Sequence, residues 1–488
     1  MMRALTFVRA ALLAFALAAA APAFAWQQSL QQRVTAQLAE ARPGTRFGLV
    51  VTDANGRELI AINANDRFIP ASNTKLFTTA AAFANFSGLD QPDATGGAAV
   101  RLETGRRGPP NVILVGNGDA RLSSMPDCVA NCLAALADAV AARTRRVRNV
   151  IGDDTLFPDQ RWSPGMSWNN IVTGYGTGIS ALTLDDNEIR LRVAPGAAGQ
   201  PPALDHLPYY RIVNEAVTVA DGETQLRFTR MPGSLELRLT GRILASAPQQ
   251  TLRLGIDDPA HYAATRLRAL LEARGVRVTG QVAVRHRPAE GGEGEQPTRN
   301  ARPAPSSEPV LARLTPPPLA EDLTRINKES QNLHTELMVR RLGLIRGSGS
   351  ISDGVAMIEA MMTQAGAPRT GWDLSDGSGM SSYNRMAPRA VVALLRWAAT
   401  QPWGAAWRET FPVAGVDGTL TRRFRGTPLE RRLFAKTGTL NATNALSGYM
   451  IARSGRTLTF SFFANDVPGG GSATATMDAM LATIAEAN

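Results

Sequence analysis

The chain has 488 residues, of which 44% are hydrophobic and 19% are charged. At roughly 100–200 residues per domain, this length predicts a few globular domains, and the composition excludes a disordered, fibrous or collagenous protein. Two cysteines and four widely spaced histidines exclude a disulfide-dense scaffold and match no cysteine or histidine metal motif. We therefore expect no metal and no other cofactor, with carboxylates as the only ligand type left for a metal.

The net charge of +10 is spread along the chain. No long basic run or nucleic-acid-binding motif accompanies it, so we expect no nucleic-acid partner. Peripheral contact with a membrane or an anionic wall polymer stays open. Only three of the 52 basic residues are lysines, namely Lys75, Lys328 and Lys436. An ammonium can lose its proton when desolvated and a guanidinium cannot, so these positions are candidates for proton chemistry. The alternative is that these three lysines remain by chance and have no such role.

Residues 1–25 have the organisation of a secretory signal peptide. Two arginines precede an apolar stretch over 10–21, and Ala23-Phe24-Ala25 is a small-x-small cleavage site. The apolar stretch is shorter than the ~20 residues that a membrane-spanning helix needs. We expect cleavage after Ala25 and export of the mature chain, residues 26–488, to a bacterial periplasm.

The mature chain begins with a helix and a hairpin. Apolar spacing over 29–41 predicts the helix. Strands over 46–52 and 57–63 flank an Asp-Ala-Asn-Gly turn and predict the hairpin. A second helix is expected to begin near Ser72, with Lys75 one turn further on.

Residues 97–290 contain many short strand patterns between glycine, proline and aspartate breaks. Cys128 and Cys132 have the i, i+4 spacing that places them on one face of a helix near its start, and we favour a local disulfide without a catalytic role. A helix is expected over 258–275. Residues 287–309 are rich in Pro, Gly, Glu and Arg and predict a flexible loop or linker.

The C-terminal third returns to mixed structure. A helical region begins at 316, a strand hairpin turns at Ser454-Gly455, and a final amphipathic helix covers 477–487. These patterns predict one α/β domain that is split around a long, mostly β insertion.

The expected division places the catalytic domain in residues 26–90 and 305–488. The inserted accessory region, residues 91–304, is expected to form one or two nested subdomains.

Three short motifs carry the chemistry. Ser72-Asn73-Thr74-Lys75 has the pattern S-x-x-K, in which a neutral lysine amine can accept the serine proton if burial or a second cation lowers its pKa. Alone, an N-capping serine beside a surface lysine is the simpler explanation. Ser330-Gln331-Asn332 (S-x-N) and Lys436-Thr437-Gly438 (K-T-G) follow in order, and this ordered set is typical of serine β-lactamases and penicillin-binding proteins.

The sequence resembles the low-molecular-mass class C penicillin-binding proteins, which are D-alanyl-D-alanine carboxypeptidases and endopeptidases. The segments that are similar to blocks of that family, in the same order, are PASNTKLFTTAAAF, VGNGD, SALTLDDNEI, INKESQNLHTE, LSDGSGMSSYNR and AKTGTLNATNALSGY. The long gap between S-x-x-K and S-x-N distinguishes this family from single-domain β-lactamases. One departure is Gln331, where the family often has aspartate. The resemblance implies a transpeptidase-like α/β fold, an antiparallel sheet flanked by helices.

The resemblance also implies a role for each site residue. Ser72 would attack the carbonyl of the penultimate D-alanine after Lys75 takes its proton, and Ser330 would relay that proton to the leaving amine. Asn332 would bind the substrate amide and hold Lys75. The backbone N–H groups of Ser72 and Thr439 would form an oxyanion hole. The residues that would bind the substrate's carboxylate and backbone are Lys436, Thr437, Gly438 and Thr439.

Two interpretations are open for each of three further features, namely one lysine, one loop and one histidine. Lys328 is either a solvated lysine or a cation that keeps Lys75 neutral. The loop Asp376-Gly377-Ser378-Gly379 is favoured as a cleft-lining turn over a second nucleophile, because no histidine base accompanies it. His334 is favoured as a satisfied helix histidine over a base.

Together these features predict a periplasmic serine peptidase that removes terminal D-alanine from peptidoglycan stem peptides, cleaves D,D cross-links, or does both. β-Lactams are expected to acylate Ser72 covalently. A β-lactamase or esterase on the same fold is one alternative, although a small antibiotic needs no such insertion. A non-catalytic wall-binding scaffold is another, although the complete motif set argues against it. The sequence leaves the oligomeric state open.

Overall fold

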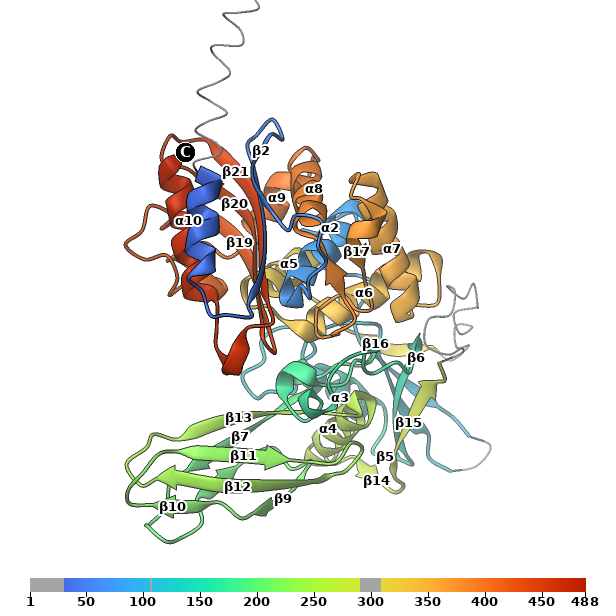
Figure 1. The fold of residues 1–488 in the computed structure, drawn as a ribbon. Coiled ribbons are helices and arrows are strands. Elements are labelled where there is room, and N and C mark those ends of the chain that lie inside the picture. The colour runs from blue at the N-terminus through green and yellow to red at the C-terminus, as the bar shows by residue number, and fades with distance from the viewer. Residues whose placement is uncertain (1–29, 106–107, 290–308) are drawn as a thin grey trace, which may run out of the picture.

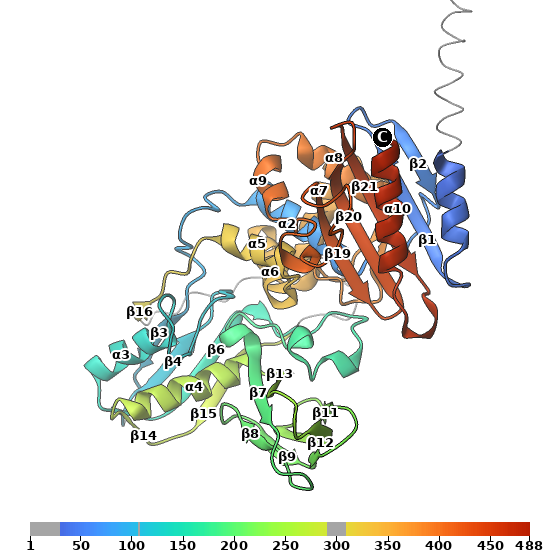
Figure 2. The same cartoon turned by 90° about the vertical axis from the view of Figure 1, so that its left-hand side faces the viewer.

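The computed structural model describes residues 30–105, 108–289 and 309–488. Figures 1 and 2 show an upper part, in which helices cover a sheet, and a lower part that is richer in strands. The expected signal peptide and most of the expected linker over 287–309 lie outside the described residues. Within the described ranges, no helix is both long enough and apolar enough to cross a bilayer.

The upper part is built on a five-stranded antiparallel sheet that joins the two ends of the chain. The hairpins predicted near both ends form as expected, with the second turning at Ser454-Gly455. The sheet order is β19-β20-β21-β1-β2. Its strands are β1 (Arg46–Thr52), β2 (Glu58–Ile62), β19 (Leu433–Leu440), β20 (Thr443–Ile451) and β21 (Thr457–Asn465).

Helices cover both faces of this sheet (Figure 1). On one face, the helix over 30–39 and α10 (Thr474–Ala487) bury apolar side chains such as Leu30 and Ile484 in a shared core. On the other face, α2 (Lys75–Asn85) and α8 (Pro388–Ala399) pack with further helices in a second core. The fold is therefore the expected α/β arrangement of an antiparallel sheet flanked by helices.

The remaining helices of this part are α5 (Leu319–Lys328), α6 (Asn332–Arg346), α7 (Ile351–Gln364) and α9 (Gly404–Glu409). The helical region predicted from residue 316 is interrupted between α5 and α6. Ser330 lies in this break with φ of 62°, a left-handed conformation that a non-glycine residue rarely adopts.

The lower part contains a second five-stranded sheet with the order β15-β6-β4-β3-β16. Two helices, α3 (Leu133–Arg143) and α4 (Pro259–Ala273), bury their apolar faces in its core. Gly152 on β6 allows a close approach, because a Cβ there would lie 2.3 Å from the Ala260 carbonyl oxygen on α4. The strands are β3 (Ala99–Glu103), β4 (Asn111–Val115), β6 (Val150–Pro158), β15 (Val282–Arg287) and β16 (Val310–Arg313).

Smaller sheets complete the lower part. One has the order β13-β7-β8, and another has β12 between β10 and β11, with β9 also paired to β12. Their strands are β7 (Glu188–Ala194), β8 (Ala203–Asp205), β9 (Arg211–Asn214), β10 (Val217–Val219), β11 (Gln225–Thr229), β12 (Glu236–Leu244) and β13 (Gln250–Gly255). Two-residue strands form two further pairs. β5 (Arg146–Val147) pairs with β14 (Arg277–Val278) in the lower part, whereas β17 (Trp372–Asp373) pairs with β18 (Arg385–Met386) in the upper part, where Trp372 and Met386 join the core of α2 and α8.

The two cysteines form the favoured local disulfide, but their expected place within a helix was wrong. Cys132 has an extended backbone and is the residue immediately before α3, so both cysteines precede the helix. Asn131 between them has φ of 59°. The bridge therefore closes a turn at the helix entrance, a geometry that the i, i+4 spacing also permits.

Candidate active site

Ser72 lies at the entrance of α2, in the short 3-10 helix η1 (Ala71–Thr74). Ala71 has φ of 47°, so the backbone turns sharply just before the serine. Gly379 packs directly against this turn, since a Cβ there would lie 1.8 Å from the Ala71 carbonyl oxygen. Lys75, the first residue of α2, follows one turn later and meets the serine as the S-x-x-K spacing predicts.

Lys75 is fully buried and its amine has three oxygen neighbours. Its Nζ lies 2.9 Å from Ser72 Oγ, 2.7 Å from Asn332 Oδ1 and 2.6 Å from the carbonyl oxygen of Ser378. A neutral amine has two N–H groups and one lone pair. It can donate to the two carbonyl-type oxygens and accept the proton of the Ser72 hydroxyl, which is the arrangement of a general base.

Burial lowers the pKa of Lys75 from its ordinary value of 10.5 to about 7, against the opposing negative charges of Asp376 and Glu336. Burial, reinforced by the nearby charge of Glu336, raises the pKa of Asp376 to about 6. For Lys75, burial favours the neutral amine, whereas the charges of Asp376 and Glu336 favour the ammonium form. Both forms are therefore present near neutral pH.

Ser330 and Asn332 come from the break between α5 and α6. Ser330 Oγ accepts a hydrogen bond from Lys436 Nζ at 2.9 Å. Asn332 is held at both ends of its amide, because Oδ1 accepts from Lys75 and Nδ2 donates to the Tyr175 carbonyl oxygen at 2.9 Å. The orientation of this amide is thus fixed by contacts from both parts of the molecule.

The K-T-G residues lie on β19, at one edge of the sheet. Lys436 is buried, and its Nζ also donates to the Thr437 carbonyl oxygen at 2.9 Å. Burial, together with the charge of Lys75, lowers the pKa of Lys436 well below its ordinary value. The Thr437 hydroxyl donates to that of Thr419 at 2.7 Å, and Thr439 is exposed.

Gly438 brings η1 and β19 into contact. A Cβ at this position would lie 2.8 Å from the Pro70 carbonyl oxygen and 3.2 Å from the Asn73 backbone nitrogen. Asn73 Nδ2 also donates to the Lys436 carbonyl oxygen at 2.8 Å. The structure therefore brings the Ser72, Ser330–Asn332 and Lys436–Thr439 segments together at one place.

Two acidic residues that the motifs did not identify organise the loop beside Lys75. Glu336 Oε1 accepts from the backbone N–H groups of Gly377 and Ser378 at 3.0 and 2.8 Å. Asp376 accepts from the backbone of Gly379 and from two further donors. The Asp-Gly-Ser-Gly loop lies against Lys75 through the backbone of Ser378, as a cleft-lining loop would. The only feature of the sequence that could have pointed to Glu336 is its position one helical turn after Asn332, on the same side of α6.

Lys328 and His334 have partners away from the serine. Lys328 Nζ lies 2.6 Å from Asp417 Oδ2, so it is an ion-paired lysine rather than a freely solvated one. His334 is buried on α6, with Asp322 and Asp186 at 3.1 and 3.0 Å from its two ring nitrogens. Despite burial, these carboxylates raise the pKa of His334 to about 8. His334 is therefore the satisfied helix histidine that the sequence favoured.

The lower part of the molecule reaches the site through residues 161–179. A small pocket of about 20 Å³ is lined by Met166 and Tyr175 from this segment and by Asn332, Ser378 and Met380 from the upper part, among others. The region beside the Lys75 amine is therefore built from both parts.

Comparison with known proteins identifies the family of this chain. The model of the D-Ala-D-Ala carboxypeptidase 3 (S13) family matches residues 30–487. The D-alanyl-D-alanine carboxypeptidase of Actinomadura sp. (strain R39) is 34% identical over 510 residues, covering 99% of this chain and 90% of that protein. The carboxypeptidase DacB of Haemophilus influenzae is 23% identical, with 86% of each chain covered.

Solved structures show the same fold. The crystal structure of penicillin binding protein 4 (dacB) from Haemophilus influenzae matches with a TM-score of 0.75 and 21% identity, covering 93% of this chain and 97% of that one. A second structure of that protein, complexed with a β-lactam, matches with a TM-score of 0.71 and 20% identity, covering 92% and 98%. The chain belongs to the D-Ala-D-Ala carboxypeptidase 3 (S13) family and is a serine-type carboxypeptidase of the penicillin-binding protein class.

Proposed function

We propose that this carboxypeptidase acts in the periplasm on peptidoglycan, where it removes the terminal D-alanine of stem peptides and also cleaves D,D cross-links through an acyl-enzyme on Ser72. The observation that carries the proposal is the buried Lys75 amine, 2.9 Å from Ser72 Oγ with two carbonyl-type oxygens as its other partners. This arrangement fits a lysine that accepts the serine proton.

Acylation begins when Lys75 takes the Ser72 proton. The serine oxygen then bonds to the carbonyl carbon of the penultimate D-alanine, and the backbone N–H groups of Ser72 and Thr439 bind the oxyanion. The C–N bond to the terminal residue breaks as the amine receives the proton from Lys75 through the Ser330 hydroxyl.

The substrate's terminal carboxylate binds beside Lys436, Thr437 and Gly438. Arrival of that negative charge favours the ammonium form of Lys436, which burial otherwise disfavours. Asn332 binds the substrate amide. A water molecule then attacks the acyl-enzyme with Lys75 as base, which releases the shortened peptide and restores the Ser72 hydroxyl.

Endopeptidase activity needs the same steps with a larger leaving amine. In a D,D cross-link, as in a D-Ala-D-Ala terminus, the leaving amine stands next to a carboxylate. Thr439 on the edge strand is exposed, and Ser330 and Thr437 are only half-buried. This side of the site is open to solvent, which supports acceptance of a bulky leaving group.

β-Lactams place a strained amide next to a carboxylate and are proposed to acylate Ser72 covalently. The Haemophilus influenzae relative with a bound β-lactam supports this proposal. We also propose the division into a catalytic domain, residues 26–90 and 305–488, and an inserted region over 91–304. The second boundary moves to a point after β16 (Val310–Arg313), because β16 pairs with β3 of the lower sheet. Residues 1–25 are proposed to act as a signal peptide that directs export of the mature chain to the periplasm.

The test is intact-protein mass spectrometry of residues 26–488 after incubation with penicillin, beside Ser72→Ala. We expect a covalent adduct on the wild type alone. An unmodified wild type with intact antibiotic contradicts acylation of Ser72, and rapid antibiotic hydrolysis instead indicates a β-lactamase.

Digestion of purified muropeptides separates the two peptidase activities. We expect loss of D-alanine from pentapeptides and conversion of D,D-cross-linked dimers to monomers, both abolished by Ser72→Ala. Dimers that persist while pentapeptides are trimmed contradict the endopeptidase activity.

A further inference from the structure

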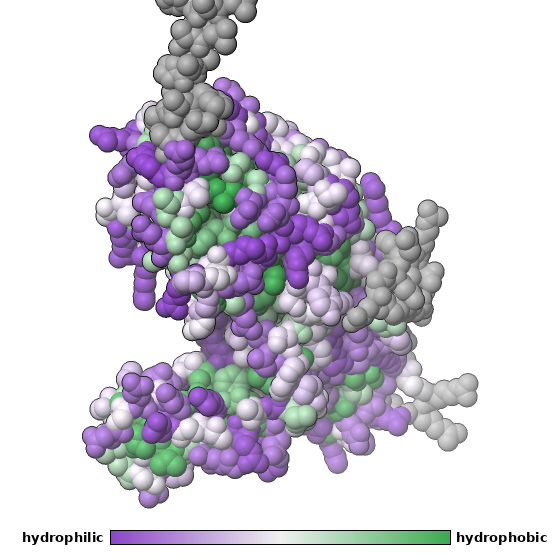
Figure 3. Space-filling view, viewed as in Figure 1, coloured by the Kyte–Doolittle hydropathy of each residue, from purple (hydrophilic) through white to green (hydrophobic). Residues whose placement is uncertain are grey.

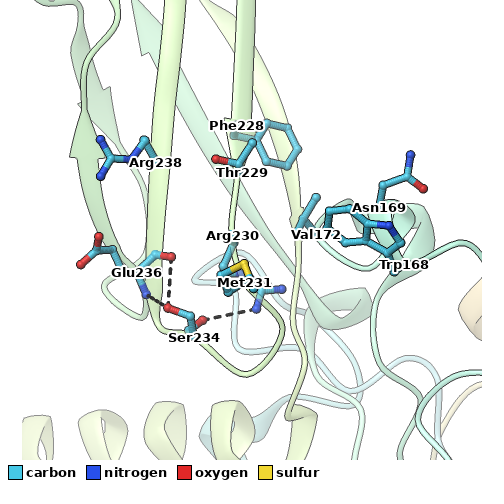
Figure 4. A pocket seen from close by; sticks show the side chains of 10 residues that line it. All are labelled: Trp168, Asn169, Val172, Phe228, Thr229, Arg230, Met231, Ser234, Glu236 and Arg238. Atoms are coloured by element: carbon cyan, nitrogen blue, oxygen red, sulfur yellow. Dashed lines mark hydrogen bonds between the residues drawn. The ribbon is translucent and has the colours of Figure 1, made fainter.

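A pocket of about 590 Å³ lies in the lower part of the molecule, outside the set of residues that surround Ser72. One wall is the short helix η2 (Trp168–Asn170) with Val172, and the other is formed by β11, β12 and the turn that joins them (Figure 4). Its size lies in the range of about 300–1,000 Å³ that is typical of small-ligand sites.

The apolar lining of this pocket includes side chains that solvent reaches. Trp168 is 67% exposed and Met231 is 72% exposed, although large apolar side chains usually lie inside. Figure 4 shows the Phe228 ring directed toward Val172 and Trp168. In the space-filling view, hydrophobic surface appears among hydrophilic residues on this lower, strand-rich part (Figure 3). An exposed indole beside a concave surface offers a flat face for a ligand to stack on.

The charges of the lining are balanced. Each charged side chain that lines the pocket has an oppositely charged partner, and the pairs are Arg230 with Asp257, Glu236 with Arg211, and Arg238 with Glu215. The pocket therefore offers no net charge to attract an anion or a cation. The exposed side chains of Asn169 and Thr229 add neutral hydrogen-bonding groups.

We propose that this pocket binds the glycan strand of peptidoglycan, a neutral chain of N-acetylhexosamines, and so holds the polymer while its stem peptides are cleaved. A sugar ring has an apolar C–H face that stacks on Trp168, and its hydroxyl and acetamide groups pair with the amide and hydroxyl on the rim. The absence of net charge favours such a ligand over a charged peptide. The inference rests on the proposed action on peptidoglycan.

The same short segment borders this pocket and the catalytic residues. Trp168 lines the pocket, whereas Tyr175 lines the small pocket beside Asn332 and accepts the hydrogen bond of the Asn332 amide. Tyr175 follows Trp168 by seven positions, which span at most about 25 Å, comparable with a short extended peptide. Thr173 pairs with Leu254 on β13, which fixes the segment to the rest of the lower part. A glycan strand that binds at Trp168 therefore places its stem peptides on the same side of the molecule as the site around Ser72.

Calorimetric titration of residues 26–488 with the tetramer of N-acetylglucosamine tests the proposal. We expect binding to the wild type and an affinity about tenfold lower for Trp168→Ala, which corresponds to the stacking contribution of one aromatic ring. Trp168→Phe keeps a ring and should retain most of the affinity. Val217→Ala, an exposed apolar change on the neighbouring β10, is the matched control and should bind like the wild type.

A second titration uses the wild type after acylation by penicillin. Because the pocket is separate from Ser72, the acylated enzyme should bind the tetramer with unchanged affinity. Loss of binding on acylation would place the sugar in the catalytic cleft and overturn the inference. Equal binding by wild type and Trp168→Ala, or no binding by either, would overturn it as well, as would Trp168-dependent binding of a sugar-free stem peptide in place of the tetramer. Failure of the proposed function is distinguishable, since it appears as a missing penicillin adduct whatever the sugar result.

Discussion

The ionisation of Lys75 predicts how fast penicillin acylates this enzyme at each pH. Burial shifts the pKa of Lys75 from 10.5 to about 7. At pH 7, an unshifted lysine would be neutral in about 0.03% of molecules, whereas a pKa near 7 leaves about half of them neutral. The shift therefore makes the base form about 10³-fold more abundant. Since only the neutral amine can accept the Ser72 proton, the acylation rate should rise with pH and level off above about 7.

The assay is stopped-flow acylation by a fluorescent penicillin between pH 5.5 and 9. Asp376→Asn removes a negative charge that raises the pKa of Lys75, so its profile should move to lower pH. Lys328→Met is the control, and since Lys328 pairs with Asp417, its profile should match the wild type. A wild-type rate that is flat across this range, or that still rises steeply at pH 9, would refute the assignment of Lys75 as a base with a lowered pKa.

Three further predictions follow from the packing. Gly438→Ala should slow acylation roughly tenfold to a hundredfold, because the added Cβ, 2.8 Å from the Pro70 carbonyl oxygen, displaces η1 from β19; Gly371→Ala, with milder contacts, is the control in the same acylation assay. His334 has its pKa raised from 6.5 to about 8, so it stabilises the fold fully below pH 6.5, by about 2 kcal/mol, and this is lost as the pH rises through 8. Urea unfolding at pH 6 and pH 9 should therefore show a larger deficit for His334→Gln at pH 6, and an equal deficit at both would contradict the role. Cys132→Ser should lower the unfolding free energy by about 2 kcal/mol, the value for so short a loop, while leaving acylation unchanged.

The sequence predicted the parts of the fold that local pattern controls. Alternation and turn residues located the two hairpins of the upper sheet, and the ordered motifs identified the segments that meet around Lys75. The break before Asn332 was not predicted, because no glycine or proline marks it. Ser330 adopts its left-handed conformation in a tertiary setting, where Lys436 binds its hydroxyl.

The contacts that tune the site were also beyond sequence reasoning. Glu336 and Asp376 act through backbone N–H groups and through charge at a distance. The sequence indicated that the loop beginning at Asp376 lines the cleft, but it gave no sign that either carboxylate acts on Lys75. The Tyr175 contact with Asn332 uses a main-chain carbonyl, which any residue type would supply. Such contacts depend on how distant segments pack and leave no mark in residue identity.

The topology of the upper sheet determines when the enzyme can become active. Arg46 on β1 and Asp466 just after β21 form an ion pair across 420 positions of the chain, and Lys436 lies on β19, among the last strands to be made. Closing a sheet over so long a separation is slow, whereas the strands and helices of the lower part are nearer one another in sequence and can fold earlier. A chain whose C-terminal strands have not yet paired thus carries Ser72 and Lys75 without the strand that holds Lys436. In the proposed mechanism hydrolysis requires Lys436, so the enzyme should stay inactive until the C-terminal strands join β1.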